Sequence, residues 1–330
     1  MASGFVNPGR RRCLNTLGAL GLSSAWSAAA LAGGFASPAT AAASEFVANK
    51  APRVVSLSWA GAQILVSLGI VPLGIAERAD YPLSGAVPAM PASVLELGLH
   101  SEPNLELLQQ IKPDLIVIDA NQSDLDARLR SIAPTVTIDI YNAARGKPFA
   151  RAVAETQRIG ALLGRDAAVH RHLDEVDAQL AACAATVSTL AVPPVLIVDL
   201  YDDGRHLYLY GPNSMMQDVM DRLGVRNAWT GSTDTGYLLL GIEGLAAMGE
   251  AQMFYISHGV RDQIALHNLS RSVLWQHLPF VQAQRFKPLP GFFAYGSTPC
   301  AVQFASELTR QLAALDGQTH QAQQTGRARG

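Results

Sequence analysis

Residues 166–190 read DAAVHRHLDEVDAQLAACAATVSTL. Apolar side chains recur in this stretch at alternating spacings of four and three, namely at Val169, Leu173, Val176, Leu180, Cys183, Val187 and Leu190. This periodicity predicts one long amphipathic helix that begins with Asp166 as its cap and ends before Pro193. At 1.5 Å per residue the helix would be roughly 37 Å long, which is enough to cross two domains. We call residues 166–190 the spine helix.

The segments on the two sides of the spine helix repeat one plan. Before it, apolar strands are predicted at 54–57, 73–76 and 114–118, with helices at 63–70 and 105–111. After it, strands are predicted at 195–198 and 253–256, with helices at 217–225 and 242–248. Such alternation is typical of parallel sheets. The sequence therefore predicts an α/β fold of two lobes with parallel-rich sheets, joined by the spine helix, with a ligand cleft between the lobes.

These patterns give the boundaries of the parts. The N-terminal lobe covers residues 52–148, a helix pair that includes the spine helix covers 149–191, and the C-terminal lobe covers 192–315. Residues 316–330 are polar and show no apolar periodicity, so we expect a disordered tail there.

The first 43 residues have the composition of an export signal. They contain no Asp or Glu, carry Arg10, Arg11 and Arg12, and continue into an alanine-rich apolar run followed by small residues at 39–43. Small residues in this place are typical of a signal-peptide cleavage site. The consecutive arginines favour a twin-arginine signal led by Arg10 and Arg11, and an ordinary secretory signal is the alternative. The protein is therefore expected to reach the periplasm.

Composition and motifs argue against several classes of protein. The chain has 25 basic and 27 acidic residues, and loss of the three signal arginines leaves 22 against 27, so nucleic acid is not an expected partner. The chain lacks Gly-x-Ser-x-Gly, His-Glu-x-x-His, Cys-x-x-Cys and Gly-Lys-Ser/Thr, so we do not expect an enzyme. Its histidines are scattered and do not have the spacing of a metal site.

Three groups of segments carry a resemblance to a known family. They are RVVSLSW at 53–59 with LGIVPLG at 68–74, GLHSEPNLE at 98–106 with KPD at 112–114, and GPNS at 211–214 with NAW at 227–229. Together they resemble the periplasmic binding proteins that deliver iron chelates and cobalamin to ABC importers, most closely the ferric-hydroxamate type. The resemblance covers about residues 52–315 and implies two lobes linked by a helix that move little on binding.

The same resemblance implies a set of ligand-binding residues, which are Trp59, His100, Gln122, Tyr237, Phe293 and Tyr295. Trp59 follows the first strand, where the family has a pocket tryptophan. Phe293 and Tyr295 match an aromatic patch of the second lobe. A pocket tyrosine of the family falls near 121–122, and a further pocket tryptophan falls near 236–237.

His100 stands where the ferric-hydroxamate type has an arginine that donates to the oxygens of the chelate. Arginine offers a permanent charge and a fork of donors, whereas histidine offers one or two donors and a charge that depends on pH. The resemblance implies a ferric siderophore, hydroxamate-bearing, as the ligand. Haem, cobalamin and citrate- or catechol-type iron chelates stay open as alternatives. No cofactor and no directly bound metal are implied, because iron enters only as part of the chelate.

Glu106 and Glu243 come early in corresponding helices of the two halves. The family carries one surface carboxylate per lobe at these positions to meet arginines of the permease. The resemblance therefore implies that both residues dock the protein, as a monomer, onto an inner-membrane ABC permease with its ATPase. The alternative is that each carboxylate only stabilises the positive end of its helix dipole.

The arginine pair generates a prediction about export. Replacing Arg10 and Arg11 by Lys should stop processing of the signal and leave the precursor in the cytoplasm, because the twin-arginine route requires the arginines themselves. Immunoblots of periplasmic and cytoplasmic fractions measure this outcome. Normal processing of the double variant would assign the chain to the ordinary secretory route.

Overall fold

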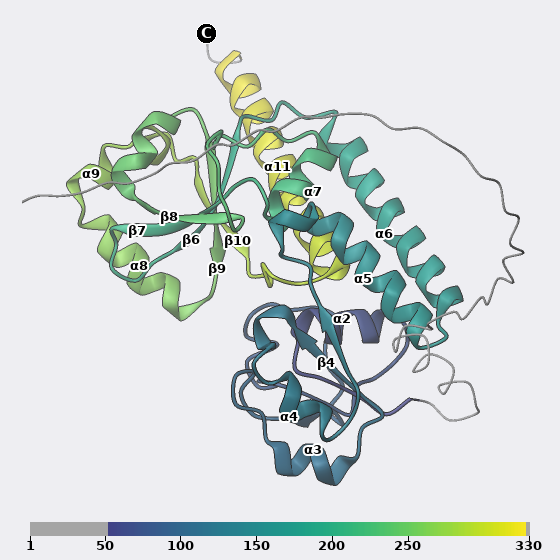
Figure 1. The fold of residues 1–330 in the computed structure, drawn as a ribbon. Helices are drawn as coiled ribbons and strands as arrows, with labels where there is room; N and C mark the ends of the chain where they lie inside the picture. The colour runs from purple at the N-terminus through teal and green to yellow at the C-terminus, as the bar shows by residue number, and fades with distance from the viewer. Residues whose placement is uncertain (1–51, 328–330) are drawn as a thin grey trace, which may run out of the picture. The chain divides into compact units, whose positions relative to one another are not determined.

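A computed structural model describes residues 52–327. The predicted signal peptide, with Arg10 and Arg11, lies outside the described residues, and the prediction of its type stays a prediction. Two five-stranded sheets precede and follow a pair of long helices (Figure 1). The predicted α/β fold of two lobes with parallel-rich sheets and one long helix is confirmed.

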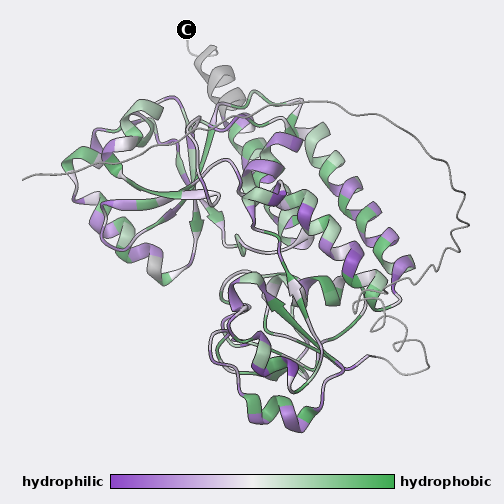
Figure 2. Ribbon diagram, in the orientation of Figure 1, coloured by the Kyte–Doolittle hydropathy of each residue, from purple (hydrophilic) through white to green (hydrophobic). Residues whose placement is uncertain are grey.

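The sheet of the first lobe is parallel throughout, in the order β3-β2-β1-β4-β5. Its strands are β1 (Val54–Ser56), β2 (Gly74–Ile75), β3 (Leu95–Glu96), β4 (Leu115–Asp119) and β5 (Thr135–Ile138). The helices of this lobe are α2 (Trp59–Ser67), α3 (Leu105–Ile111) and α4 (Asp126–Arg130), with short 3-10 helices at Ala120–Gln122 (η1) and Ala143–Arg145 (η2). The central strands β1 and β4 are buried on both faces, which explains why Val54, Val55 and residues 115–118 are all apolar (Figure 2).

The sheet of the second lobe is mixed, in the order β10-β9-β6-β7-β8. Its strands are β6 (Val195–Leu200), β7 (His206–Tyr210), β8 (Tyr237–Gly241), β9 (Gln252–Ser257) and β10 (Phe286–Pro290). β10, β9 and β6 run parallel, whereas β7 and β8 are antiparallel to their neighbours. The helices here are α7 (Met215–Leu223), η3 (Ile242–Met248), α8 (Val260–Ser270), α9 (Val273–Gln276) and α10 (Pro279–Gln282). The helix predicted at 242–248 is therefore of the 3-10 type.

The helix pair consists of α5 (Pro148–Leu162) and α6 (Asp166–Val187), which lie side by side (Figure 1). The spine helix is thus present but ends three residues before its predicted end. The hydroxyls of Ser188 and Thr189 donate to the carbonyls of Ala185 and Thr186, and these bonds compete with further helical turns. The two helices approach so closely at Gly160 that a Cβ there would overlap the Val169 side chain.

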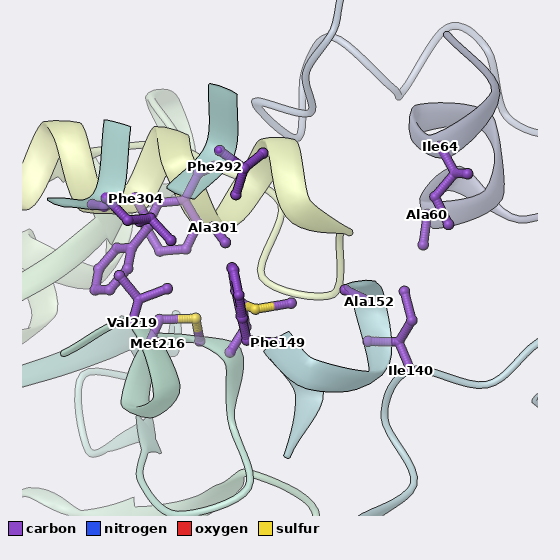
Figure 3. Close-up of a cluster of buried hydrophobic side chains, with 14 of the residues drawn as sticks. Ala60, Ile64, Ile140, Phe149, Ala152, Met216, Val219, Phe292, Ala301 and Phe304 are labelled. Atoms are coloured by element: carbon purple, nitrogen blue, oxygen red, sulfur yellow. The ribbon is translucent and has the colours of Figure 1, made fainter. Parts of the chain in front are cut away.

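The main core lies between the helices and the two sheets. Phe149 at the start of α5 packs near Met216 and Val219 of α7, and Phe304 of α11 (Thr298–Arg327) lies in the same cluster (Figure 3). The Arg222 guanidinium lies 4.0 Å from the centroid of the Phe149 ring, where it makes a cation–π contact. Helix α5 thereby ties the first lobe to α7 of the second.

The prediction of a disordered tail from residue 316 is wrong over the described residues, since α11 continues to Arg327. The polar tail shows no apolar stripe, but Gln and Ala are good helix formers. A helix that has already begun extends without paying the cost of nucleation again. Within residues 52–327, none of the helices combines the length and apolar character that a bilayer crossing requires.

Candidate ligand-binding site

A cavity of about 630 Å³ is lined by residues of both lobes. On the first-lobe side, Leu57 and Ala120 directly follow β1 and β4, and Glu77 lies two residues after β2. This is the edge where open parallel sheets bind ligands. The lining consists of Leu57, Trp59, Glu77, His100, Asp119, Ala120, Asn121, Ile138, Asp139, Ile140, Tyr141, Thr235, Tyr237, Phe293 and Tyr295. The structure thus brings together five of the six predicted ligand residues, with Gln122 as the exception.

Aromatic rings form a continuous wall across this cavity. The Trp59 ring centroid lies 5.0 Å from that of Phe293 in an edge-to-face arrangement. Tyr295 lies 5.2 Å from Tyr141 and 6.2 Å from Tyr237 by the same measure. The indole nitrogen of Trp59 donates to the Ala76 carbonyl at 2.8 Å, which fixes the plane of the ring. The wall offers rigid apolar faces to a ligand with a carbon skeleton.

Buried hydrogen bonds hold the loop of Phe293 and Tyr295 against the first lobe. Gln63 of α2 is fully buried, and its amide oxygen accepts from the Ser297 backbone at 2.7 Å. Its amide nitrogen donates to the Cys300 sulfur at 3.1 Å, and burial raises the pKa of that thiol to about 11. The Tyr141 hydroxyl donates to the backbone carbonyls of 294 and 296. The two halves of the cavity are therefore joined by direct bonds.

The His100 side chain is held by the carboxylate of Glu77, and the His100 backbone carbonyl accepts from Gln122. Its Nδ1 lies 2.8 Å from Oε1 of Glu77, and because a carboxylate only accepts, Nδ1 is the donor. Nε2 is therefore the ring nitrogen left for a ligand. Glu77 has a left-handed backbone with φ of 49°, which is uncommon outside glycine and is found at functional sites.

Gln122 lies behind the cavity and does not line it. Its side chain is buried, donates to the His100 carbonyl at 2.6 Å and accepts from the Asp119 backbone at 2.7 Å. The structure therefore does not place Gln122 among the residues that line the cavity, because both ends of its amide bond the backbone. Its neighbour Asn121 lines the cavity instead.

Asp119 is a partly buried carboxylate at the end of β4 that the sequence analysis missed. Burial raises its pKa to about 6, although the hydrogen bond from Ser58 (2.7 Å) and the nearby His100 act in the opposite direction. Burial also raises the pKa values of Tyr141 and Tyr295, with neighbouring ionisable groups adding to the effect. The phenols therefore stay neutral at physiological pH.

The remaining charges of the cavity are compensated within the protein. Asp139 pairs with Arg145 and Arg151, each with a nitrogen 3.1 Å from Oδ2. Within the described residues, His100 is the one basic side chain among those that line the cavity. The site therefore offers no unpaired permanent cation to an anionic ligand.

Glu106 and Glu243 lie outside the cavity and are exposed. Each is the second residue of its helix, α3 and η3 respectively. Residues 52–327 contain no cluster of three or more His, Cys, Asp or Glu side chains that could hold a metal ion.

Comparison with known proteins assigns the chain to a family. The family model for periplasmic binding proteins matches residues 54–291. The chain belongs to the periplasmic binding protein family. The Iron(3+)-hydroxamate-binding protein FhuD of Escherichia coli (strain K12) is 34% identical over 259 residues, which cover 78% of this chain and 85% of the relative. The Fe(3+) dicitrate-binding periplasmic protein FecB of the same organism is 23% identical over 246 residues, which cover 73% and 77%.

Among solved structures, FhuD from Vibrio cholerae bound to Fe3+-Desferal has a TM-score of 0.71 and 27% identity, and covers 81% of this chain and 100% of its own. This periplasmic binding protein therefore shares its fold with a siderophore-binding relative over nearly all the described residues. The resemblance drawn from the three groups of segments is confirmed.

The raised pKa of Asp119 generates a prediction about stability. Its ordinary pKa is 3.8 and its folded pKa is about 6, so between these values the folded protein holds a proton that the unfolded chain lacks. The stability that protonated Asp119 contributes is lost as the pH rises through about 6, and it returns as the pH falls below that value. Lowering the pH from 7 to 5 should raise the free energy of unfolding of the wild type, relative to Asp119→Asn, by about 1 kcal/mol.

Urea unfolding of both proteins across this range measures the difference. A difference that does not change with pH would show that Asp119 titrates as it does in the unfolded chain.

Proposed function

We propose that this periplasmic binding protein captures a ferric siderophore of the hydroxamate type and delivers it to an ABC importer. The observation that carries the proposal is the cavity itself, which combines aromatic faces from both lobes with no unpaired permanent cation. The name of the Escherichia coli relative and the chelate bound to the Vibrio cholerae protein support the same ligand class. Its role is binding and delivery, and iron enters only inside the chelate.

The charge of the chelate separates the candidate ligands. Three hydroxamates balance Fe3+ and give a neutral core, whereas catecholate and citrate chelates are anionic and haem carries two propionates. An anion buried without a partner is strongly disfavoured. Arg145 and Arg151 do not line this cavity, and their guanidinium groups pair with Asp139. The cavity therefore suits a neutral ferric core better than an anionic one.

His100 orients the chelate through Nε2. When the ring is neutral, its proton lies on Nδ1 beside Glu77, so Nε2 can only accept. Chelate oxygens also accept, so a bond forms only when the ring takes up a second proton. Binding is therefore coupled to proton uptake, and the resulting charge-assisted bond is roughly twice as strong as a neutral one.

We also propose that Glu106 and Glu243 dock the protein, acting as a monomer, onto the permease in the inner membrane. Both are exposed and lie on different lobes, so a partner that binds both contacts the two lobes together. The permease and its ATPase supply the energy of transport.

The ligand proposal is tested by tryptophan fluorescence quenching, since Trp59 lines the cavity. The neutral ferric hydroxamate should bind tightly, and its affinity should rise as the pH is lowered, because the bond from Nε2 to a chelate oxygen requires a second proton on the ring. His100→Ala should cost about 1–2 kcal/mol of binding free energy and flatten the pH profile, and His100→Arg should flatten it without the loss.

Asp119→Asn is the control for these titrations, because burial raises the pKa of Asp119 to about 6. An unchanged pH profile in His100→Ala would remove His100 from the site. Tight binding of hemin, cobalamin, ferric citrate or a ferric catecholate in place of the hydroxamate would overturn the ligand class.

The docking proposal predicts a separation of uptake from affinity. Glu106→Ala combined with Glu243→Ala should abolish uptake of 55Fe-labelled chelate by cells while leaving the affinity of the purified protein nearly unchanged, since neither residue lines the cavity. Glu250→Ala, another exposed carboxylate of the second lobe, serves as the matched control. Loss of affinity in the double variant would place these residues in ligand binding instead.

A further inference from the structure

The aromatic wall of the cavity continues beyond its lining along the second lobe. The Tyr208 ring of β7 lies 5.4 Å from Tyr237, and the Tyr201 ring lies 6.0 Å from Tyr208. Neither of these two tyrosines lines the cavity, and Tyr201 is 43% exposed. Tyr201 thus presents an exposed aromatic ring at the end of a row of rings that begins in the cavity.

A carboxylate without full hydrogen bonding accompanies this row. Asp199 of β6 lies directly opposite Tyr208 of β7, so their side chains share one face of the sheet. Its Oδ1 is buried and finds no hydrogen-bond partner within residues 52–327. Its Oδ2 lies 3.3 Å from Nε2 of His258. A buried carboxylate oxygen left without a partner requires an explanation.

Asp199 and His258 also lie at the edge of the sheet where α/β proteins bind ligands. Asp199 is the penultimate residue of β6, Tyr201 directly follows that strand, and His258 directly follows the parallel neighbour β9. Ligands of open α/β sheets bind outside the carboxyl ends of the strands. The field of Asp199 reaches the cavity, because it contributes to the raised pKa values of Tyr210 and Tyr295.

We propose that Asp199, Tyr208 and Tyr201 form a subsite for a positively charged pendant group of the chelate. The subsite rests on the proposed function, since the iron-bearing core occupies the adjoining cavity. An alkylammonium group is attracted to tyrosine faces and forms charge-assisted hydrogen bonds with a carboxylate. The turn that follows adds Asp202 and Asp203 against Arg205, so the local charge is acidic when the histidines are neutral.

The carboxylates within the cavity are poorer candidates for this role. Glu77 is paired with His100, and Asp139 is paired with two arginines. Asp119 is partly buried and accepts a hydrogen bond from Ser58. Asp199 alone among these four combines an unpartnered oxygen, within the described residues, with an exposed aromatic neighbour on the way out of the cavity.

Two chelates that differ in one charge test the subsite. The Fe3+ complex of Desferal ends in a primary amine that is protonated at neutral pH, and its N-acetylated derivative has the same iron core without the charge. The wild type should bind the charged complex about five- to tenfold more tightly in low salt. Asp199→Asn should reduce this preference to below twofold while leaving the affinity for the acetylated complex unchanged.

Tyr201→Ser provides a second variant at an exposed position, and it should reduce the preference partially without affecting the fold. Asp203→Asn is the matched control, because Asp203 lies on the same turn but pairs with His206 at 2.6 Å. Equal affinity of the wild type for the two complexes, or an undiminished preference in both Asp199→Asn and Tyr201→Ser, would overturn the subsite and leave the proposed function standing. Failure of both complexes to bind the wild type would overturn the proposed function.

Discussion

The geometry of the site depends on the two hydrogen bonds that the fully buried amide of Gln63 makes. This amide bonds the backbone of Ser297 and the thiol of Cys300, so it joins α2 of the first lobe to the start of α11. A buried amide that loses its partners costs about 1–3 kcal/mol, so separation of the lobes at this point is disfavoured. The loop between β10 and α11 is fixed by these bonds, and Phe293 is thereby held against Trp59.

This constraint explains how a small set of side chains can form a prepared cavity. The helix pair and α11 connect the lobes through apolar packing, and Gln63 and Tyr141 add direct polar bonds beside the cavity. A site whose walls are already in place loses less conformational freedom when a ligand binds. Affinity can then come from burial of apolar surface, at roughly 25 cal/mol per Å² before the costs of association.

The periodicity of the spine helix and the strand alternation predicted the two lobes, because these signals are local. The family resemblance led to Trp59, Tyr237 and Tyr295, and the structure places all three in the lining of the cavity. Asp119, Tyr141 and Glu77 were missed, since their roles depend on partners distant in sequence, as with Tyr141 and the backbone of residues 294 and 296. Gln122 was named for the same reason, because the sequence did not show whether the amide of Asn121 or that of Gln122 would line the cavity.

The three carboxylates of the first lobe that line the cavity, Glu77, Asp119 and Asp139, are each held by another group of the protein. Glu77 holds His100, two arginines hold Asp139, and Ser58 donates to Asp119. Such groups fix one another's positions but leave little net charge for a ligand, so selectivity rests on shape, aromatic surface and one titratable donor. The second lobe differs at Asp199, where one oxygen lacks a partner within the described residues. The proposed subsite at Asp199 would therefore distinguish the charge of a pendant group, whereas the cavity distinguishes the charge of the iron-bearing core.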